Sequence, residues 1–206
     1  MIDIRKTYIC GWAQAIRGMR NPMNSWDESD SDIDYYDEMN KIGPNDLNLM
    51  KRLASAGTDH RKFMRMITIY VDITAPLYWW KEFDTYKVGT VSNSCSTMHK
   101  IHDRIFSLGD FSHEHLEDAA IEVLKQTVDA LNCYRNMYMK TKSKHYWWQM
   151  IQLLPSSYNQ MRTVMLNYEV LANIYKSRKN HKLDEWIKFC NWIESLPYSE
   201  LITGGD

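Results

Sequence analysis

Residues 66–73 alternate between branched apolar residues and a partly polar set, Met66, Thr68, Tyr70 and Asp72. Four branched apolar residues occupy every second position there: Ile67, Ile69, Val71 and Ile73. A period of two puts these side chains on one face of a strand, so the stretch predicts a β-strand with one face in the core. Thr74 and Pro76 then predict a helix, with Thr74 as its cap and Pro76 in its first turn.

Most of the remaining chain has helical periodicity, with apolar residues recurring every three or four positions. The expected helices cover residues 12–19, 44–56, 98–108, 116–140, 145–154, 157–176 and 184–196. Asn45 or Asp46 is the expected cap of the second helix, and Gly57 its left-handed stop. A short edge strand is expected within residues 1–10. The pattern therefore predicts a helix-rich α+β protein, in which a small, mostly antiparallel sheet packs with long helices.

A polar, acid-rich segment separates the first two expected helices. Residues 21–42 contain Pro22 and a dense run of aspartate and glutamate, which predicts a mobile or ligand-covering loop. Residues 203–206 are expected to be a frayed tail. The sequence shows no internal repeat and no low-complexity linker, so we expect a single domain over residues 1–206.

Composition narrows the class of protein. The chain has 206 residues, 44% of them hydrophobic, which is enough for a sizeable core. Its formal net charge of −1 gives no global field to attract nucleic acid or a membrane surface. No apolar run approaches the roughly 20 residues of a membrane helix, and the N-terminus is charged where a signal peptide is apolar. The four cysteines lack metal-ligand spacing. We expect a cytoplasmic protein with free thiols, no resident metal, and neither nucleic acid nor membrane as partner.

Small polar residues gather after the Pro76 helix, around Gly89. These candidate nucleotide-binding residues are Lys81, Glu82, Lys87, Thr90, Ser92, Asn93, Ser94, Cys95, Ser96 and Thr97. Small hydroxyl side chains beside a glycine let the backbone approach a phosphate closely and donate N–H bonds. The alternative is a serine-rich surface turn. Arg17 and Arg20, near Trp26, are candidates to clamp a phosphate, with a structural loop as the alternative. No catalytic residue is assigned.

The succession of strand, proline-led helix and polar loop in residues 60–99 resembles the central segment of the flavin-dependent thymidylate synthases, also called thymidylate synthase complementing proteins. That family methylates dUMP with FAD, a folate and NADPH, and its signature is RHRxxSxNExSxR. Aligned on Pro76, the signature falls on residues 85–97, and none of its eight fixed residues is identical. Thr85, Tyr86 and Lys87 stand at the RHR positions.

The resemblance implies a degenerate active site. In the family, these arginines and the histidine hold the phosphates of FAD and dUMP. Each hydrogen bond to a charged group is worth about 1.5–3 kcal/mol, so replacing arginine with threonine should weaken both sites. Further upstream, His60 coincides with the histidine of the family's Gly-His element, whereas Arg65 and Met66 replace a glutamate and a second histidine.

The C-terminal half extends the resemblance to roughly residues 44–196. Residues 154–181 resemble the family's LP…N…LxNFLxLR…H segment, with Asn167, Asn173 and Arg178 in phase. In the family, the arginine at the Arg178 position contacts the pyrimidine ring of dUMP. The resemblance therefore implies nucleotide contacts by Arg178 and Asn173, and a homotetramer with sites between subunits. The alternative for Arg178 is a surface arginine that favours the helix dipole.

These observations lead to the hypothesis of a nucleotide-binding protein of this fold that has lost thymidylate synthase activity. It would bind or sequester a nucleotide or a nucleotide-derived ligand. No cofactor is assigned; FAD would require a rebuilt site, because its motif is missing. Two alternatives stay open. One is a divergent FAD-dependent thymidylate synthase acting on dUMP with a folate and NADPH, and the other is a non-catalytic oligomeric scaffold.

Overall fold

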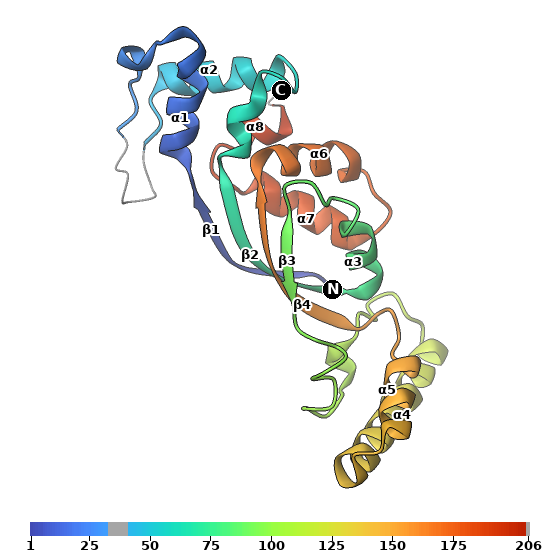
Figure 1. Cartoon of the computed structure of the whole chain (residues 1–206). Coiled ribbons are helices and arrows are strands. Elements are labelled where there is room, and N and C mark those ends of the chain that lie inside the picture. Colours follow the sequence, from blue (N-terminus) through green and yellow to red (C-terminus); the bar gives the residue numbers. More distant parts are fainter. Residues whose placement is uncertain (33–40, 205–206) are drawn as a thin grey trace. The chain divides into compact units, whose positions relative to one another are not determined.

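The fold contains a four-stranded antiparallel sheet (Figure 1). The structure, a computed structural model, describes residues 1–32 and 41–204. The strands are β1 (Asp3–Cys10), β2 (Thr68–Pro76), β3 (Val91–Ser94) and β4 (Asn159–Asn167), in the order β1-β2-β4-β3. The α-helices are α1 (Trp12–Arg20), α2 (Pro44–Ser55), α3 (Leu77–Phe83), α4 (Asp118–Thr141), α5 (Lys144–Leu153), α6 (Tyr168–Arg178), α7 (Asp184–Glu194) and α8 (Glu200–Thr203). Short 3-10 helices are η1 (Asn21–Met23), η2 (Trp26–Glu28), η3 (Arg61–Arg65) and η4 (Leu108–Asp110). The predicted fold class, a small antiparallel sheet with long helices, is confirmed.

The alternation in β2 is confirmed, but the predicted start of the next helix is wrong. Thr74 still belongs to the strand, and Pro76 is the extended residue that precedes α3. The first amides of α3 are bonded across the sheet, because Leu77 N–H donates to Tyr158 O at 3.0 Å. The carbonyl of Tyr158, and not the side chain of Thr74, therefore accepts the hydrogen bond from the amide at the start of α3.

The predicted helix over residues 157–176 is wrong in its first half. Residues 159–167 form β4, and α6 begins only at Tyr168. Within β4, Gln160, Val164 and Leu166 are buried, whereas Thr163 is exposed, so the burial follows a period of two. Pairing with β2 selects this period over the helical one, because a strand's preference depends on its neighbours more than on its own residues.

The predicted helix over residues 98–108 is also wrong. This segment forms turns that end in η4. The side chain of Asn132 holds both backbone groups of Phe106, accepting from its N–H and donating to its carbonyl, each at 2.9 Å. Backbone groups held by a side chain cannot enter a helical ladder, so tertiary contact overrides the local pattern.

The predicted cap of α2 is wrong as well. Gly43 stands at the N-cap, and the capping carboxylate belongs to Asp30. Its oxygens accept from Asn45 N–H at 2.9 Å and Asp46 N–H at 3.1 Å. Of the predicted loop 21–42, residues 21–32 thus form η1, η2 and a bonded connection, whereas residues 33–40 lie outside the described residues. Residues 205–206 of the predicted tail also lie outside them.

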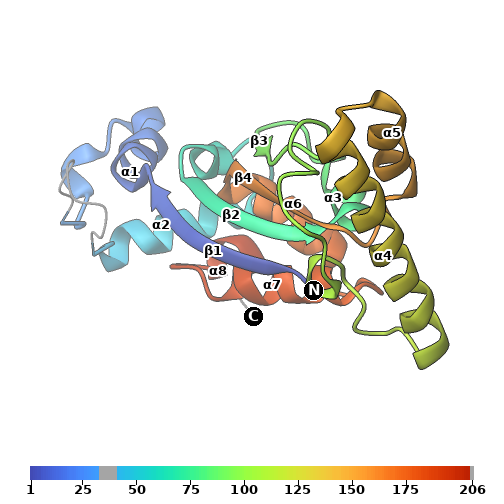
Figure 2. The same cartoon turned by 90° about the horizontal axis from the view of Figure 1, so that it is seen from below.

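The chain divides into two compact units, so the prediction of a single domain stays a prediction. The first comprises residues 1–3, 73–85 and 93–162, and the second residues 4–72, 86–92 and 163–206. In the first unit, α4 and α5 form a helical hairpin (Figure 2). The hydrophobic core around this hairpin consists of Ile101, Phe106, Phe111, Leu124, Val128, Leu131 and Met150.

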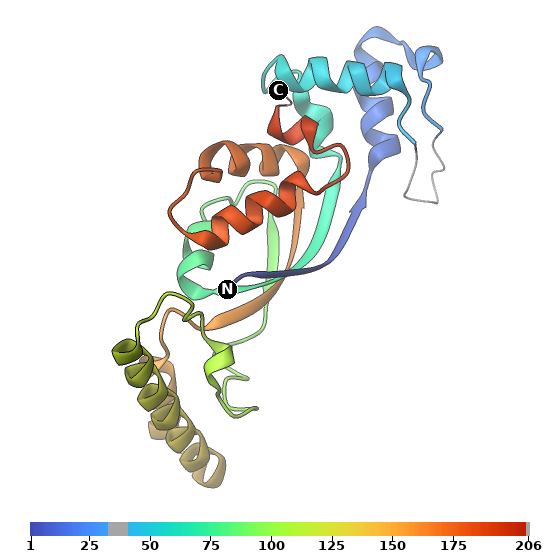
Figure 3. The same ribbon diagram turned by 180° about the vertical axis from the view of Figure 1, so that it is seen from behind.

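In the second unit, α6 and α7 lie on one face of the strands (Figure 3). Buried residues of β2 and of these two helices form its core: Ile69, Val71, Leu171, Ile174, Trp186, Phe189 and Ile193. The 3-10 helix η3 contacts α1, α2 and α6, which gives it a central place in this unit. No helix in the described part of the chain is long and apolar enough to cross a membrane.

Candidate functional site

The predicted phosphate-binding loop is partly an edge strand. Ser92, Asn93 and Ser94 lie in β3 with exposed side chains, which corrects the prediction of a loop. Cys95, directly after β3, donates its N–H to Met161 O at 2.9 Å, and its carbonyl accepts from Gln160 Nε2 at 2.8 Å. Sheet pairing therefore occupies backbone groups that a phosphate cradle would need.

The other candidates of this segment differ in burial and in hydrogen bonding. Ser96 Oγ accepts from the N–H of His99 at 2.9 Å and so closes its own turn. Thr90 Oγ1 is buried and has no hydrogen-bond partner among the described residues. Lys81 and Lys87 are exposed, whereas Glu82 and Thr97 are half-buried. The set is divided between the two units, with Lys87, Thr90 and Ser92 in the second and the rest in the first.

Arg178, at the end of α6, stacks on aromatic rings. Its guanidinium carbon lies 4.7 Å from the ring centroid of Trp186 and 5.7 Å from that of Tyr86. Its Nε–H donates to Tyr86 Oη at 2.9 Å. Such cation–π contacts are stabilising because a ring face is electron-rich. The two segments that carry the family resemblance therefore meet here, through Tyr86 at the middle RHR position and Arg178.

These residues bear on whether the flavin motif could hold FAD. Among Thr85, Tyr86 and Lys87, only Lys87 carries a positive charge, and Tyr86 already accepts a hydrogen bond from Arg178. A diphosphate requires several charge-assisted donors. The donor set at these positions does not fit the diphosphate of FAD.

A cluster that the sequence did not reveal joins η3 to α6; we call it the η3–α6 cluster, formed by Arg61, Arg65, Glu169 and Asn173. The carboxylate of Glu169 is 3.4 Å from Arg61 Nε and 3.2 Å from Arg65 Nη2, and Arg65 Nε bonds it as well. Arg61 Nη2 also donates to Asn173 Oδ1 at 3.0 Å. The predicted candidate Asn173 thus lies beside Arg61.

The charges in the η3–α6 cluster are unbalanced. The hydrogen bond from Arg65, opposed by burial and supported by the charges of both arginines, lowers the pKa of Glu169. The same hydrogen bond and charge raise the pKa of Arg65. Two guanidinium groups share one buried carboxylate, so the cluster keeps a net positive charge. The basic run of residues 60–65 was a visible signal, but its partner Glu169 became evident only from the structure.

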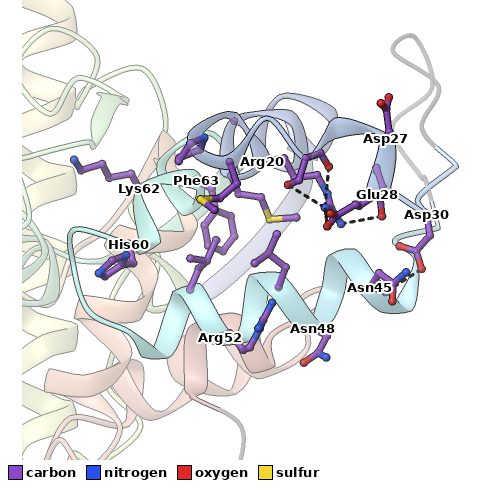
Figure 4. Close-up of a pocket in the computed structure, with 18 of the residues that line it drawn as sticks. Arg20, Asp27, Glu28, Asp30, Asn45, Asn48, Arg52, His60, Lys62 and Phe63 are labelled. Carbon is purple, nitrogen blue, oxygen red and sulfur yellow. Dashed lines mark hydrogen bonds and ion pairs between the residues drawn. The ribbon is translucent and has the colours of Figure 1, made fainter.

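A groove of about 1300 Å³ runs between α1, α2 and η3 in the second unit (Figure 4); we call it the α1–α2 groove. His60 and Lys62 lie at one end, and Asp27 and Glu28 at the other. Along α2, its lining residues are Asn45, Asn48, Leu49, Arg52 and Leu53. Clefts that hold small ligands usually measure about 300–1,000 Å³, so this groove is large enough for a nucleotide.

Arg20 supports the wall of this groove. The prediction that Arg20 clamps a phosphate is therefore corrected. Its side chain is 3% exposed and its Nε donates to Asp46 Oδ1 at 2.7 Å. Its remaining nitrogens donate to Ser25 O at 3.0 Å and Glu28 O at 3.2 Å. With its nitrogens bonded to protein, Arg20 holds the connection between η2 and α2. Arg17 is exposed on α1 and does not line the groove.

The partner of Arg20 is a fully buried carboxylate. Asp46 Oδ2 accepts from the hydroxyls of Ser29 and Ser31, each at 2.6 Å. Burial favours the neutral acid, but these two hydrogen bonds and the bond and charge of Arg20 lower the pKa of Asp46. Asp46 is therefore ionised at neutral pH. Among the described residues, no three His, Cys, Asp or Glu side chains gather to hold a metal ion.

Comparison with known proteins gives a result at the level of structure. No protein-family model and no curated protein matches the chain. The flavin-dependent thymidylate synthase ThyX from Helicobacter pylori, complexed with FAD and dUMP, matches with a TM-score of 0.70 and 17% identity over 98% of both chains. A second Helicobacter pylori ThyX structure with FAD and dUMP matches with a TM-score of 0.70 and 16% identity, again over 98% of both chains.

A methylase has a related structure. The UMP/dUMP methylase PolB from Streptomyces cacaoi, bound with 5-Br dUMP, matches with a TM-score of 0.59 and 12% identity, over 98% of this chain and 94% of PolB. At such identities the likeness establishes the fold. The chain has the fold of the flavin-dependent thymidylate synthases, as the resemblance of its central and C-terminal segments predicts.

Proposed function

We propose that the protein binds a nucleotide or a nucleotide-derived ligand and no longer makes thymidylate. One observation carries the proposal. The chain shares its fold over 98% of its length with a ThyX complexed with FAD and dUMP, yet Tyr86 replaces the middle residue of the flavin motif and bonds Arg178. A fold retained with one cation, Lys87, at the three RHR positions favours binding over flavin chemistry.

The cations of η3 support an anionic ligand. Arg61, Lys62 and Arg65 lie within five residues, and Glu169 fixes the direction of the two guanidinium groups. Arginine held in this way presents its remaining N–H groups without a further loss of side-chain entropy. A phosphate bound by ionised donors makes hydrogen bonds about twice as strong as neutral ones.

The proposal includes a cytoplasmic homo-oligomer with a small-molecule partner. Two of the predicted candidates on α6, Asn173 and Arg178, belong to it as residues that a bound nucleotide would contact. Of these, Arg178 has the clearest support, because Trp186 and Tyr86 hold its guanidinium in one orientation.

Mass spectrometry of the small molecules that co-purify with the full chain, together with a visible absorbance spectrum, tests the proposal. We expect a colourless protein that carries a non-flavin nucleotide, and no conversion of dUMP with FAD, a folate and NADPH. A bound flavin or dUMP turnover would favour the divergent synthase instead.

An empty protein calls for a direct titration with nucleoside monophosphates. Here Arg65→Gln should weaken binding about tenfold, because it removes one charged donor, whereas Lys125→Gln on α4 should leave binding unchanged. If no nucleotide binds in this titration, the proposal is wrong and the alternative of a non-catalytic oligomeric scaffold is favoured.

A further inference from the structure

Helix α4 carries apolar side chains on two of its faces. Leu124, Val128 and Leu131 are buried in the hydrophobic core around the α4–α5 hairpin. Val123 and Met137 belong to a different face, and these residues are 62% and 42% exposed. At 3.6 residues per turn, this second face lies roughly 130° around the helix axis from the buried one. A surface helix normally has a single apolar stripe, so the second face points to a further contact.

The second face continues along α4 as a stripe. Ala130 and Cys133 lie between Val123 and Met137, at a spacing that keeps all four residues on one side of the helix; we call these four residues the α4 stripe. Cys133 is exposed and Ala130 is half-buried. Helix α5 has 10 residues against 24 in α4, so it accompanies only part of α4 (Figure 2). The stripe is therefore open to a partner within the described part of the first unit.

The charges of the hairpin are separated along α4. Acidic residues gather at the N-terminal end of this helix: Glu117, Asp118 and Glu122. Residues 130–158 contain no acidic residue, and they include the cations Arg135, Lys140, Lys142 and Lys144. This arrangement favours the dipole of α4, but the dipole does not account for an exposed apolar stripe. Opposite charges at the two ends of one helix attract a copy of the same helix that runs in the opposite direction.

The α4 stripe is symmetric about Ala130. Val123 lies seven residues before Ala130 and Met137 seven residues after it. In an antiparallel pair of helices with a two-fold axis at Ala130, Val123 of each copy therefore meets Met137 of the other. The small side chain of Ala130 at the axis lets the helices approach within the 8–10 Å that is usual for packed helices.

The flank of the stripe adds a complementary charge pair. Glu122 and Lys140 are 18 residues apart, which corresponds to about five full turns, so they share one flank of the stripe. In the antiparallel pair, Glu122 of each copy faces Lys140 of the other. Glu122 is 2.5 Å from Lys125 on its own helix, but both side chains are exposed and such a pair is worth about 0–1 kcal/mol. Exchanging Lys125 for Lys140 of a second copy therefore costs little.

From the stripe and its charges we infer that α4 binds α4 of a second copy of this chain, antiparallel, around a two-fold axis at Ala130. Such an interface is self-complementary, because both copies contribute the same surface. The inference rests on the homo-oligomer of the proposed function and deepens it, since it names the helix, the direction and the register of one contact. It is separate from nucleotide binding, which involves the second unit.

Disulfide formation between introduced cysteines tests the contact and its direction. The full chain with Cys95→Ser and Cys133→Ser lacks its two exposed thiols. On this background, we expect Ala130→Cys to give a covalent dimer on non-reducing gels after oxidation with copper phenanthroline. Val123→Cys and Met137→Cys should each stay monomeric when oxidised alone, because identical positions would be roughly 21 Å apart along the axis and a disulfide requires Cα atoms within about 7 Å. A mixture of these two variants should form the dimer.

A control and a charge exchange complete the test. Asp129→Cys, next to Ala130 but off the stripe, should stay monomeric on the same background. Lys140→Glu in the otherwise unchanged chain should weaken self-association at least about tenfold in sedimentation velocity, because like charges then face each other. Adding Glu122→Lys to Lys140→Glu should restore the association, since the two charges have only exchanged places.

The possible outcomes separate the inference from the proposed function. If Ala130→Cys forms no dimer, the contact through α4 is wrong, and nucleotide binding is unaffected. If Val123→Cys and Met137→Cys each form dimers alone, the helices are parallel and the inference is overturned. A covalent dimer of Ala130→Cys that binds no nucleoside monophosphate would support the inference and contradict the proposed function.

Discussion

At the scale of single residues, the buried pair of Arg20 and Asp46 stands out. Asp46 is fully buried and Arg20 is 3% exposed, yet both are charged and hydrogen-bonded. Burying two charges is costly, and the cost is offset only where each charge finds partners. Here Ser29 and Ser31 complete the shell of the carboxylate, so the pair ties η2 to α2.

Removing one charge of this pair should destabilise the protein strongly. We expect Asp46→Asn to lower the free energy of unfolding by about 3 kcal/mol, because Arg20 would remain buried and charged without a counter-ion. Chemical denaturation followed by circular dichroism measures this change. Asp27→Asn, at an exposed carboxylate nearby, is the control and should stay within about 0.5 kcal/mol of the parent. A loss below about 1 kcal/mol for Asp46→Asn would show that the pair is not structural.

The carboxylates of Asp46 and Glu169 predict how the stability of the protein depends on pH. The pKa values of Asp46 and Glu169 are lower in the folded chain than in the unfolded one. The folded state therefore binds fewer protons, and its stability rises with pH through this range. At a pH above the pKa values of the unfolded chain, about 3.9 for aspartate and 4.3 for glutamate, the contribution of both groups to the free energy of unfolding is fully present.

We thus expect the free energy of unfolding to fall as the pH drops below about 4, through the lowered pKa values of the folded state. Denaturant titrations between neutral and acid pH measure the slope. In Glu169→Gln the slope should be shallower, because one linked group is gone. An unchanged slope in this variant contradicts the assignment of Glu169.

At the scale of elements, the boundary between β4 and α6 shows how one residue separates two periodicities. Asn167 ends the strand, and its Oδ1 accepts from Val170 N–H at 3.0 Å. An asparagine at this position satisfies one of the free amides at a helix start. The resemblance places Asn167 in phase with a family residue, but its role as a cap came only from the structure.

We expect Asn167→Ala to lower the free energy of unfolding by about 1 kcal/mol, through the loss of this cap. Asn167→Asp keeps an acceptor oxygen and should recover most of the loss, so thermal denaturation of both variants checks the assignment. Equal losses in both variants would mean that the side chain acts through packing, for instance against Gly89, rather than through the cap.

At the scale of the whole molecule, the open question is assembly. The family resemblance predicts a homotetramer with binding sites between subunits. One chain has a mass of 24.5 kDa, so sedimentation equilibrium distinguishes a tetramer directly from a monomer. We expect about four times the chain mass at micromolar concentration. A monomer that still binds nucleotide would show that each chain carries a complete site.

The sequence alone predicted several features correctly. The alternation in β2, the long helix α4 and the helix α5 ending before Pro155 have strong local patterns, and such patterns suffice where one face is buried. The short edge strand β1 was also predicted, although none of its residues is buried. The resemblance to the thymidylate synthase fold is confirmed by full-length structural similarity.

Other features depended on residues far apart in the chain. β4 is a strand because β2 lies beside it, and residues 98–107 are turns because Asn132 captures Phe106. Arg20 is buried because Asp46, 26 residues later, meets it. The meeting of Arg61 and Arg65 with Glu169 joins segments more than one hundred residues apart.

The sequence by itself therefore determined the fold class and the elements with strong periodicity, since each is a property of neighbouring residues. Only the tertiary structure decided which charged residues are structural and which line a groove. Burial and ion pairing depend on distances in space, and a linear pattern does not contain them.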